Sequence, residues 1–191
     1  MPFNPLNTMF LQYLKTLLQL VLNPRKAWAD VAEDNPSAAA MTERGFYPLL
    51  AIMAATAFCH GFYNPDTFSV SSSLMDALAQ FLSLFMTLLI ARGALESLLP
   101  PMEADGAVYG RNALVPVFCT GLLALINIVA NLCPIELAIF WFLPALLIIL
   151  FWHTIDYLYI KPDSTGTYMS LTTLLLVVVP VLLNFILGLV L

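Results

Sequence analysis

Four polar side chains, here called the polar stripe, interrupt an apolar run near the middle of the chain. They are Asp76, Gln80, Ser83 and Thr87. Spacings of four, three and four residues place them on one helical face. In a membrane such a face must point away from lipid. It either forms a polar path for a solute or a proton, or makes hydrogen bonds between helices worth about 0.6–2 kcal/mol each. Because no ionisable residue stands at the middle of a predicted span, hydrogen bonding is the favoured interpretation.

A second group consists of ionisable residues near the ends of apolar segments. Its members are Arg92, Glu96, Arg111, His153 and Asp156. Arg92 and Glu96 are one helical turn apart and can pair. The group predicts either a buried network of ion pairs or a binding site for an anionic lipid headgroup. Since an unpaired carboxylate beneath the headgroups is costly, we expect Asp156 within direct or water-bridged reach of Arg92 or Arg111.

None of these residues forms a recognisable catalytic arrangement. The sequence has no HExxH, no GxSxG and no glycine-rich phosphate loop. Cys59, Cys119 and Cys133 lack any CxxC or Cys/His spacing, so we interpret them as free thiols in the core. We predict no catalytic residue, no cofactor and no metal. A net charge of −5 without a basic stripe argues against nucleic acid as a partner.

Composition indicates the setting in which these residues lie. Of the 191 residues, 61% are hydrophobic and only 10% are charged, whereas soluble domains have roughly 45–50% and 25%. So few charged groups cannot coat the outside of a soluble fold. The expected fold is therefore all-α, a polytopic transmembrane helical bundle.

Five apolar segments are long enough to cross a hydrocarbon core of about 30 Å. We expect them at 45–63, 74–99, 112–132, 135–160 and 168–191. Asn127, Asn131 and Asn184 add polar groups to the third and fifth of these spans. The last three spans contain Pro116, Pro144 and Pro180, which predict kinks that shape the bundle.

Residues 1–44 hold most of the polar sequence and are expected to form cytoplasmic or interfacial amphipathic helices. Apolar positions recur at helical spacing across residues 10–22, with Gln12, Lys15 and Gln19 on the other face. A helix of about 13 residues is too short to cross, so we expect it to lie in the membrane interface. Asn23 and Pro24 predict a cap and a first helical residue for the next short helix.

Basic residues orient the five predicted spans. All seven fall on one side of the membrane in this arrangement: Lys15, Arg25, Lys26, Arg44, Arg92, Arg111 and Lys161. Because Lys and Arg favour the cytoplasmic side, we expect the N-terminus inside and the C-terminus outside.

Two stretches near the start of the chain share a pattern with a known family. They read LNPRKAWADVAE at 22–33 and GFYPLLAIMAA at 45–55. The pattern is an Asn-Pro pair, a Trp four residues after the proline, an acidic residue and a Pro-bearing first span, here Asn23, Pro24, Trp28, Glu33 and Pro48. It resembles the bacterial branch of the Yip-domain family, five-span membrane proteins related to eukaryotic factors that interact with Rab GTPases. The resemblance implies this topology and a bacterial inner membrane, and it implies neither a Rab partner nor an activity.

The sequence therefore predicts a non-enzymatic inner-membrane protein that organises the membrane or acts as a scaffold for other membrane proteins. Its expected partners are the lipid bilayer, anionic lipid headgroups and other membrane proteins. The alternative is a transporter, or a transporter subunit, that uses the polar stripe. An intramembrane enzyme ranks third. The depth of Asp76 and Asp156, and any water-filled cavity that connects them, would discriminate among these functions.

Overall fold

Helices account for nearly all of the chain that the computed structural model describes, namely residues 5–63, 68–105, 107, 110–133 and 143–190. Within these ranges there is no strand, only an isolated antiparallel bridge between Glu103 and Ile160. Four segments there are long and apolar enough to cross a membrane: Ala38–Tyr63, Val70–Leu98, Arg111–Leu132 and Pro162–Val190. The all-helical fold indicates an integral membrane protein, as the composition predicts.

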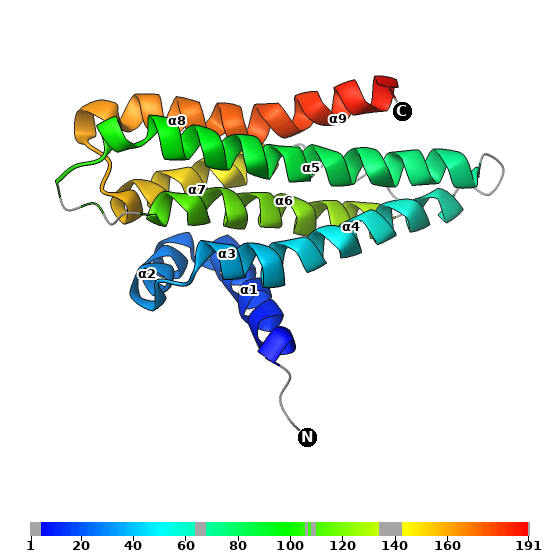
Figure 1. Cartoon of the computed structure of the whole chain (residues 1–191), viewed down its shortest axis with the longest axis horizontal. Helices are drawn as coiled ribbons and strands as arrows, with labels where there is room; N and C mark the ends of the chain where they lie inside the picture. Colours follow the sequence, from blue (N-terminus) through cyan, green and yellow to red (C-terminus); the bar gives the residue numbers. More distant parts are fainter. Residues whose placement is uncertain (1–4, 64–67, 106, 108–109, 134–142, 191) are drawn as a thin grey trace.

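The first two long segments form an antiparallel pair (Figure 1). The first consists of α3 (Ala38–Met41), a π-helical turn (Thr42–Phe46), α4 (Tyr47–His60) and a 3₁₀ turn (Gly61–Tyr63). Ser37 caps this segment by accepting a hydrogen bond from the Ala40 amide at 3.4 Å, so the helix starts earlier than position 45. The second segment is α5 (Val70–Leu98), and a 3₁₀ turn at Pro100–Met102 follows it.

The other two long segments are α6 (Leu114–Leu132), which follows a 3₁₀ turn at Arg111–Ala113, and a composite helix at the end of the chain. The composite helix runs through a 3₁₀ turn (Pro162–Ser164), α8 (Thr165–Thr173), a π-helical turn (Leu174–Val178) and α9 (Val179–Val190).

Proline positions explain the irregular turn before α9. Pro180 follows the π-helical turn almost directly. Because proline has no N–H and crowds the carbonyl four residues earlier, the turn before it widens. Pro116 and Pro144 instead lie in the first turns of α6 and α7, where a missing N–H costs little. Of the three expected kinks, this local distortion is seen at Pro180.

The fourth expected span is described only in part. Residues 134–142 lie outside the described residues, and α7 (Leu143–Leu158) supplies 16 residues, fewer than the roughly 20 that a crossing needs. In Figure 1, α6 runs toward the end of the bundle where α4 finishes, whereas α8 starts at the other end. The count of five spans stays a prediction.

Packing centres on α4, which contacts both α5 and α6. α5 also packs against α9, and α7 packs against α8 and α2 (Figure 1). The largest fully buried aromatic side chains are Trp28, Tyr13, Tyr168, Phe46, Phe118 and Phe151. Two of these come from the N-terminal helices, so the core extends beyond the predicted spans.

The N-terminal helices are α1 (Pro5–Leu22) and α2 (Pro24–Asp34). The Asn23 side chain accepts a hydrogen bond from the Lys26 amide at 3.2 Å, which confirms the expected cap. α1 buries Tyr13, Leu17 and Leu20, while Leu11, Leu18 and Leu22 are exposed on it. Part of the apolar surface expected to face lipid is therefore buried in protein, and the interfacial position of α1 stays a prediction.

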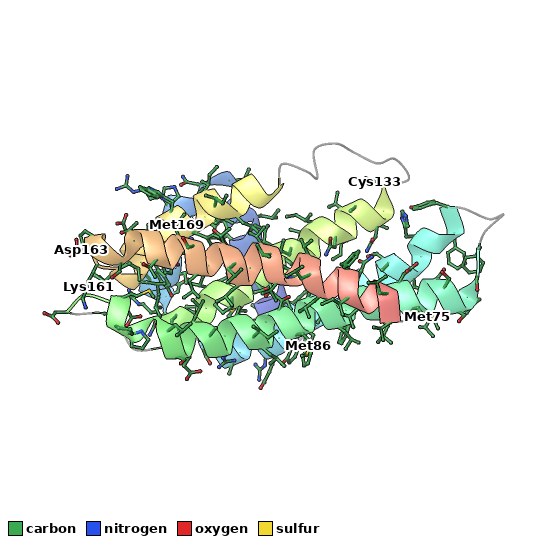
Figure 2. The ribbon with its side chains drawn as sticks, turned by 90° about the horizontal axis from the view of Figure 1, so that it is seen from above. Met75, Met86, Cys133, Lys161, Asp163 and Met169 are labelled. Carbon is green, nitrogen blue, oxygen red and sulfur yellow. The ribbon has the colours of Figure 1, made fainter. Side chains whose placement is uncertain are left out.

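The Lys and Arg residues lie at one end of the bundle, together with acidic residues such as Glu96, Asp156 and Asp163. This end, here called the basic end, holds the end of α5, the start of α6 and the turn after α7. Figure 2 shows Lys161 and Asp163 at this end, and Met75 and Cys133 toward the other. From Gly45 onward, the Lys and Arg residues of the sequence are Arg92, Arg111 and Lys161. Arg92 lies near the end of α5, and the other two lie in the turn before α6 and in the turn after α7.

Candidate functional site

The polar stripe divides into two halves that have different surroundings. Ser83 and Thr87 are buried, and each hydroxyl donates a hydrogen bond to a backbone carbonyl, that of Pro180 at 2.8 Å and that of Ser83 at 2.7 Å. Gln80 is half-buried and Asp76 is exposed. The inner half of the stripe thus supports the fold, and the outer half borders open space.

An amide pair joins the stripe to α6. Asn131 Nδ2 donates to Gln80 Oε1 at 3.1 Å, and Gln80 Nε2 donates to Asn131 Oδ1 at 3.4 Å. Asn131 Nδ2 also lies 3.4 Å from the Thr56 hydroxyl of α4. These contacts connect three helices through side chains that would be costly to leave unpaired in a membrane.

Two side chains from the first span bind carbonyls that α6 leaves free at its C-terminus. His60 Nδ1 lies 3.0 Å from the Asn131 carbonyl, and the Tyr63 hydroxyl donates to the Leu132 carbonyl at 3.0 Å. Because a carbonyl can only accept, His60 carries a proton on Nδ1. In the neutral ring, Nε2 is then left as an acceptor.

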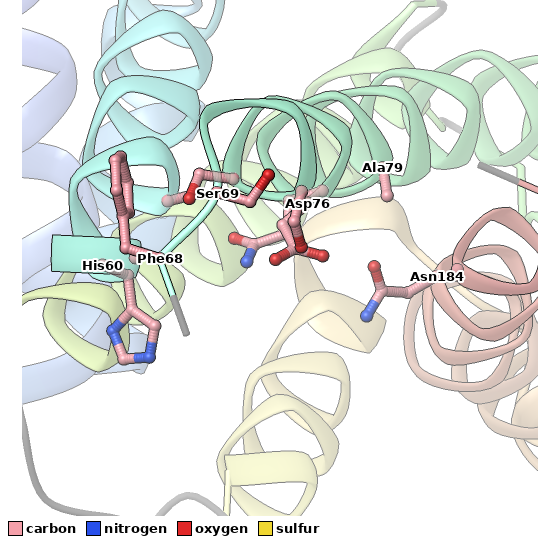
Figure 3. A pocket seen from close by; sticks show the side chains of 12 residues that line it. His60, Phe68, Ser69, Asp76, Ala79 and Asn184 are labelled. Carbon is pink, nitrogen blue, oxygen red and sulfur yellow. The ribbon is translucent and has the colours of Figure 1, made fainter. Parts of the chain in front are cut away.

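A cavity of about 310 Å³ opens beside this network, between α4, α5 and α9. Figure 3 shows Asp76 and Asn184 directed into it from α5 and α9, with His60 and Ser69 on the far side. Asp76 supplies the carboxylate among its described lining residues, and hydroxyls and amides supply most of the other polar groups. Asp76 lies about 9 Å from the start of α5, because an α-helix rises about 1.5 Å per residue.

A second cavity, of about 410 Å³, adjoins the first, since Gln80 and Asn184 line both. It continues along α5 to Ser83 and is bordered by Asn127 of α6 and Pro180 of α9. Leu84, Leu123 and Val177 make its wall more apolar. We call the two together the polar cavity.

The chemistry that this site offers is binding. Asp76 makes no ion pair within 4.0 Å in the described part of the chain, so its carboxylate is available to a cation. No group of three His, Cys, Asp or Glu residues that could hold a metal ion occurs among the described residues. Amides and hydroxyls can donate to and accept from a polar solute.

The members of this site that sequence reasoning missed include Thr56 and His60. They are four residues apart in the first span and so share a helical face. The same test of spacing that identified the polar stripe would have identified them. Asn131 and Asn184 were noted as polar groups, but their sequence positions do not indicate which helix they face.

The structure brings together only part of the expected charge cluster. Arg111, His153 and Asp156 line one cavity at the basic end, whereas Arg92 and Glu96 do not. Arg111 donates from Nη2 to the Ala32 carbonyl at 3.1 Å, and its guanidinium carbon lies 5.3 Å from the centre of the Tyr157 ring. Neither the expected pair between Arg92 and Glu96 nor a direct pair involving Asp156 is formed within 4.0 Å among the described residues.

The physical reason is that Arg111 is already engaged. Its Nη2 donates to a backbone carbonyl and its guanidinium faces an aromatic ring at the junction of α2 and α7, although its Nε has no partner among the described residues. Asp156 is exposed and can be hydrated by solvent instead.

In comparisons with family models, curated proteins and solved structures, nothing matches this chain.

Proposed function

We propose that this chain is a non-enzymatic integral membrane protein that binds a small polar solute inside its bundle, as a transporter or a transporter subunit does. The polar cavity is the observation that supports this proposal. Its two parts, of about 310 and 410 Å³, fall within the range of about 300–1,000 Å³ that is usual for ligand sites.

Interhelical hydrogen bonding does not account for the whole set of polar residues. It accounts for Ser83, and for Gln80 through its pair with Asn131, while the Thr87 hydroxyl bonds within its own helix to the Ser83 carbonyl. Asp76 and Asn184 make no side-chain hydrogen bond within the described residues, yet both line the cavity. Both side chains are exposed in the protein and lie on apolar helices, so a ligand or water is the favoured partner where they border the cavity.

The charge of the cavity suggests the class of solute. Asp76 is the carboxylate among the described lining residues, and hydroxyls from Ser69, Ser72 and Ser73 lie around it. A solute that carries one cationic group and further hydrogen-bonding groups would match this lining.

Membrane organisation or scaffolding is the second candidate. It is supported by the resemblance to the Yip domain and by the docking of α1 and α2 beside the basic end, where Trp28 packs against Phe118 and Tyr157. We further propose five spans in a bacterial inner membrane, with the N-terminus inside.

Cysteine accessibility tests the proposed cavity without knowledge of the solute. In a cysteine-free background in proteoliposomes, Asn184→Cys should react with small methanethiosulfonate reagents supplied on both sides. The Asp76 carboxylate should make the cationic aminoethyl reagent react roughly fivefold faster than the anionic sulfonatoethyl reagent. Asp76→Asn should remove that preference.

Leu182→Cys provides a matched control on the same helix, because this side chain is exposed on α9 and does not line either cavity. It should react with neither reagent, since a thiol in lipid does not ionise. If Asn184→Cys is as unreactive as Leu182→Cys, water does not enter the cavity. Solute binding would then be wrong, and the scaffold function would be favoured.

A further inference from the structure

A separate cavity, of about 270 Å³, lies at the basic end between α2, the turn before α6, and α7. It shares no lining residue with the polar cavity. The lining residues that can donate hydrogen bonds or carry charge include Arg25, Trp28, Arg111, His153, Asp156 and Tyr157. The proposed solute site does not use them.

Three buried donors without a partner belong to residues that line this cavity. They are Trp28 Nε1, Arg111 Nε and the Tyr157 hydroxyl, and within the described residues they are the buried side-chain nitrogen and oxygen atoms that have no hydrogen-bond partner. Trp28 is 2% exposed and Tyr157 is 5% exposed. Folded proteins rarely leave such groups unpaired, so three at one place indicate a missing partner.

The missing partner must be an acceptor. Trp28 Nε1 and all the nitrogens of arginine can only donate. Arg111 is held in position by the Ala32 carbonyl and the Tyr157 ring, and no carboxylate lies within 4.0 Å of its guanidinium. Arg25 adds a second positive charge at the exposed rim.

Asp156 is the carboxylate among the lining residues, and its negative charge would repel a bound anion. It is exposed and so is largely screened by solvent. The two positive charges of Arg25 and Arg111 exceed the single negative charge of Asp156. His153, one turn before Asp156 on α7, adds a further hydrogen-bond donor.

We propose that this cavity binds a phosphate group. Phosphate oxygens accept several hydrogen bonds and pair with arginine, which matches a wall of donors and guanidinium groups. Small shifts of the Trp28 and Tyr157 side chains bring their donors to the ligand. The phosphate belongs either to the headgroup of an anionic lipid, because the cavity lies at the end of the bundle, or to a soluble phosphorylated compound.

Trp28 fluorescence provides a local measurement of binding. Trp141→Phe and Trp152→Phe leave Trp28 as the remaining tryptophan of the full-length chain. In one arm, the purified protein in detergent is titrated with inorganic phosphate and with glycerol 3-phosphate. In the other arm, the protein is placed in nanodiscs of phosphatidylcholine with increasing phosphatidylglycerol. We expect a saturable change in Trp28 emission in at least one arm, and the arm that responds identifies the source of the phosphate.

Neighbouring basic residues supply a matched pair of variants. Arg25 lines the cavity, and Lys26 beside it does not, although both side chains are exposed. Arg25→Gln should weaken binding about tenfold, as expected for loss of a charge-assisted contact, and Lys26→Gln less than twofold. Asp156→Asn should strengthen binding, whereas Asp163→Asn, outside the cavity, should not.

Two outcomes would overturn the proposal. One is the absence of a saturable change in both arms. The other is equal weakening by Arg25→Gln and Lys26→Gln, which would indicate attraction to a diffuse basic surface. Arg111→Gln should also abolish binding, and if that variant does not fold, the comparison of Arg25 with Lys26 still decides.

Discussion

At the scale of single residues, Tyr13 connects α1 to the bundle through two glycines. A Cβ atom added to Gly45 would lie 2.5 Å from Tyr13 Cγ, and one added to Gly121 would overlap the Tyr13 hydroxyl. That hydroxyl donates to the Val117 carbonyl at 2.8 Å, and the ring stacks on Phe118 at 5.6 Å between centroids. Both glycines are therefore needed for close approach, not for unusual backbone angles.

Gly121→Ala should destabilise the protein by about 1–3 kcal/mol, because the added methyl group overfills a packed site and displaces the Tyr13 hydroxyl from its carbonyl. Thermal unfolding in detergent measures the effect. Gly93→Ala on α5 is the control, since nothing lies within 4 Å of the added methyl group. It should be neutral or slightly stabilising, because alanine favours helix. Equal effects of the two variants would contradict the close contact.

Spacing along one helix is the information about single residues that the sequence carries. The polar stripe was identified in this way, and the structure places Asp76 and Gln80 in one cavity. The glycine contacts could not be predicted, because Tyr13 and Gly121 lie on helices far apart in the sequence. A direct ion pair of Asp156 is not formed, since Arg111 contacts a carbonyl and a ring in a way that depends on how α2 docks; a water-bridged contact between Asp156 and Arg111, which line one cavity, stays a prediction.

At the scale of helices, length and hydropathy predicted the long apolar segments, while their partners remained unknown. The segments Val70–Leu98 and Arg111–Leu132 match the spans expected at 74–99 and 112–132 to within a few residues. The periodicity of α1 shows which side chains share a face. It does not show whether lipid or protein covers that face, and here Tyr13 and Leu17 are buried by protein.

The contact between α5 and α9 includes a hydrogen bond from one hydroxyl in the inner half of the stripe. Ser83 donates to the Pro180 carbonyl, next to the widened turn at 174–178. Ser83→Ala should lower stability in detergent by about 0.6–2 kcal/mol, the usual value of an interhelical hydrogen bond in a membrane protein. Ser97→Ala, at an exposed site on the same helix, should have no effect. If Ser83→Ala also leaves the stability unchanged, this hydrogen bond does not help to hold α9 against α5.

At the scale of the whole molecule, the two halves of the bundle have different structures. Toward the basic end, α1 packs against α6 and α2 packs against α7, and Trp28, Phe118 and Phe151 are buried there. Toward the other end the polar cavity separates α5 from α9. The proposed solute site therefore lies in one half of the bundle, so the orientation of the bundle decides from which side of the membrane a solute would reach it.

Whether the chain has four or five spans decides on which side of the membrane each end of the last helix lies. With five spans, residues 105 and 163 face the cytoplasm, and residues 71 and 190 face outward. If the chain between α6 and α8 did not cross, residues 163 and 190 would exchange sides. Single-cysteine variants Ser71→Cys, Asp105→Cys, Asp163→Cys and Val190→Cys distinguish the two topologies, because all four side chains are exposed.

Labelling of intact cells with a membrane-impermeant maleimide is the measurement, in a background without Cys59, Cys119 and Cys133. We expect labelling at positions 71 and 190, and at 105 and 163 only after the cells are permeabilised. The segregation of all seven basic residues supports this outcome, since Lys and Arg are retained on the cytoplasmic side. Labelling at 163 but not at 190, with 71 still accessible, would reduce the count to four spans. It would also place the Asn184 side of the polar cavity in the inner leaflet, so Asp76 and Asn184 could not border one cavity as they do here.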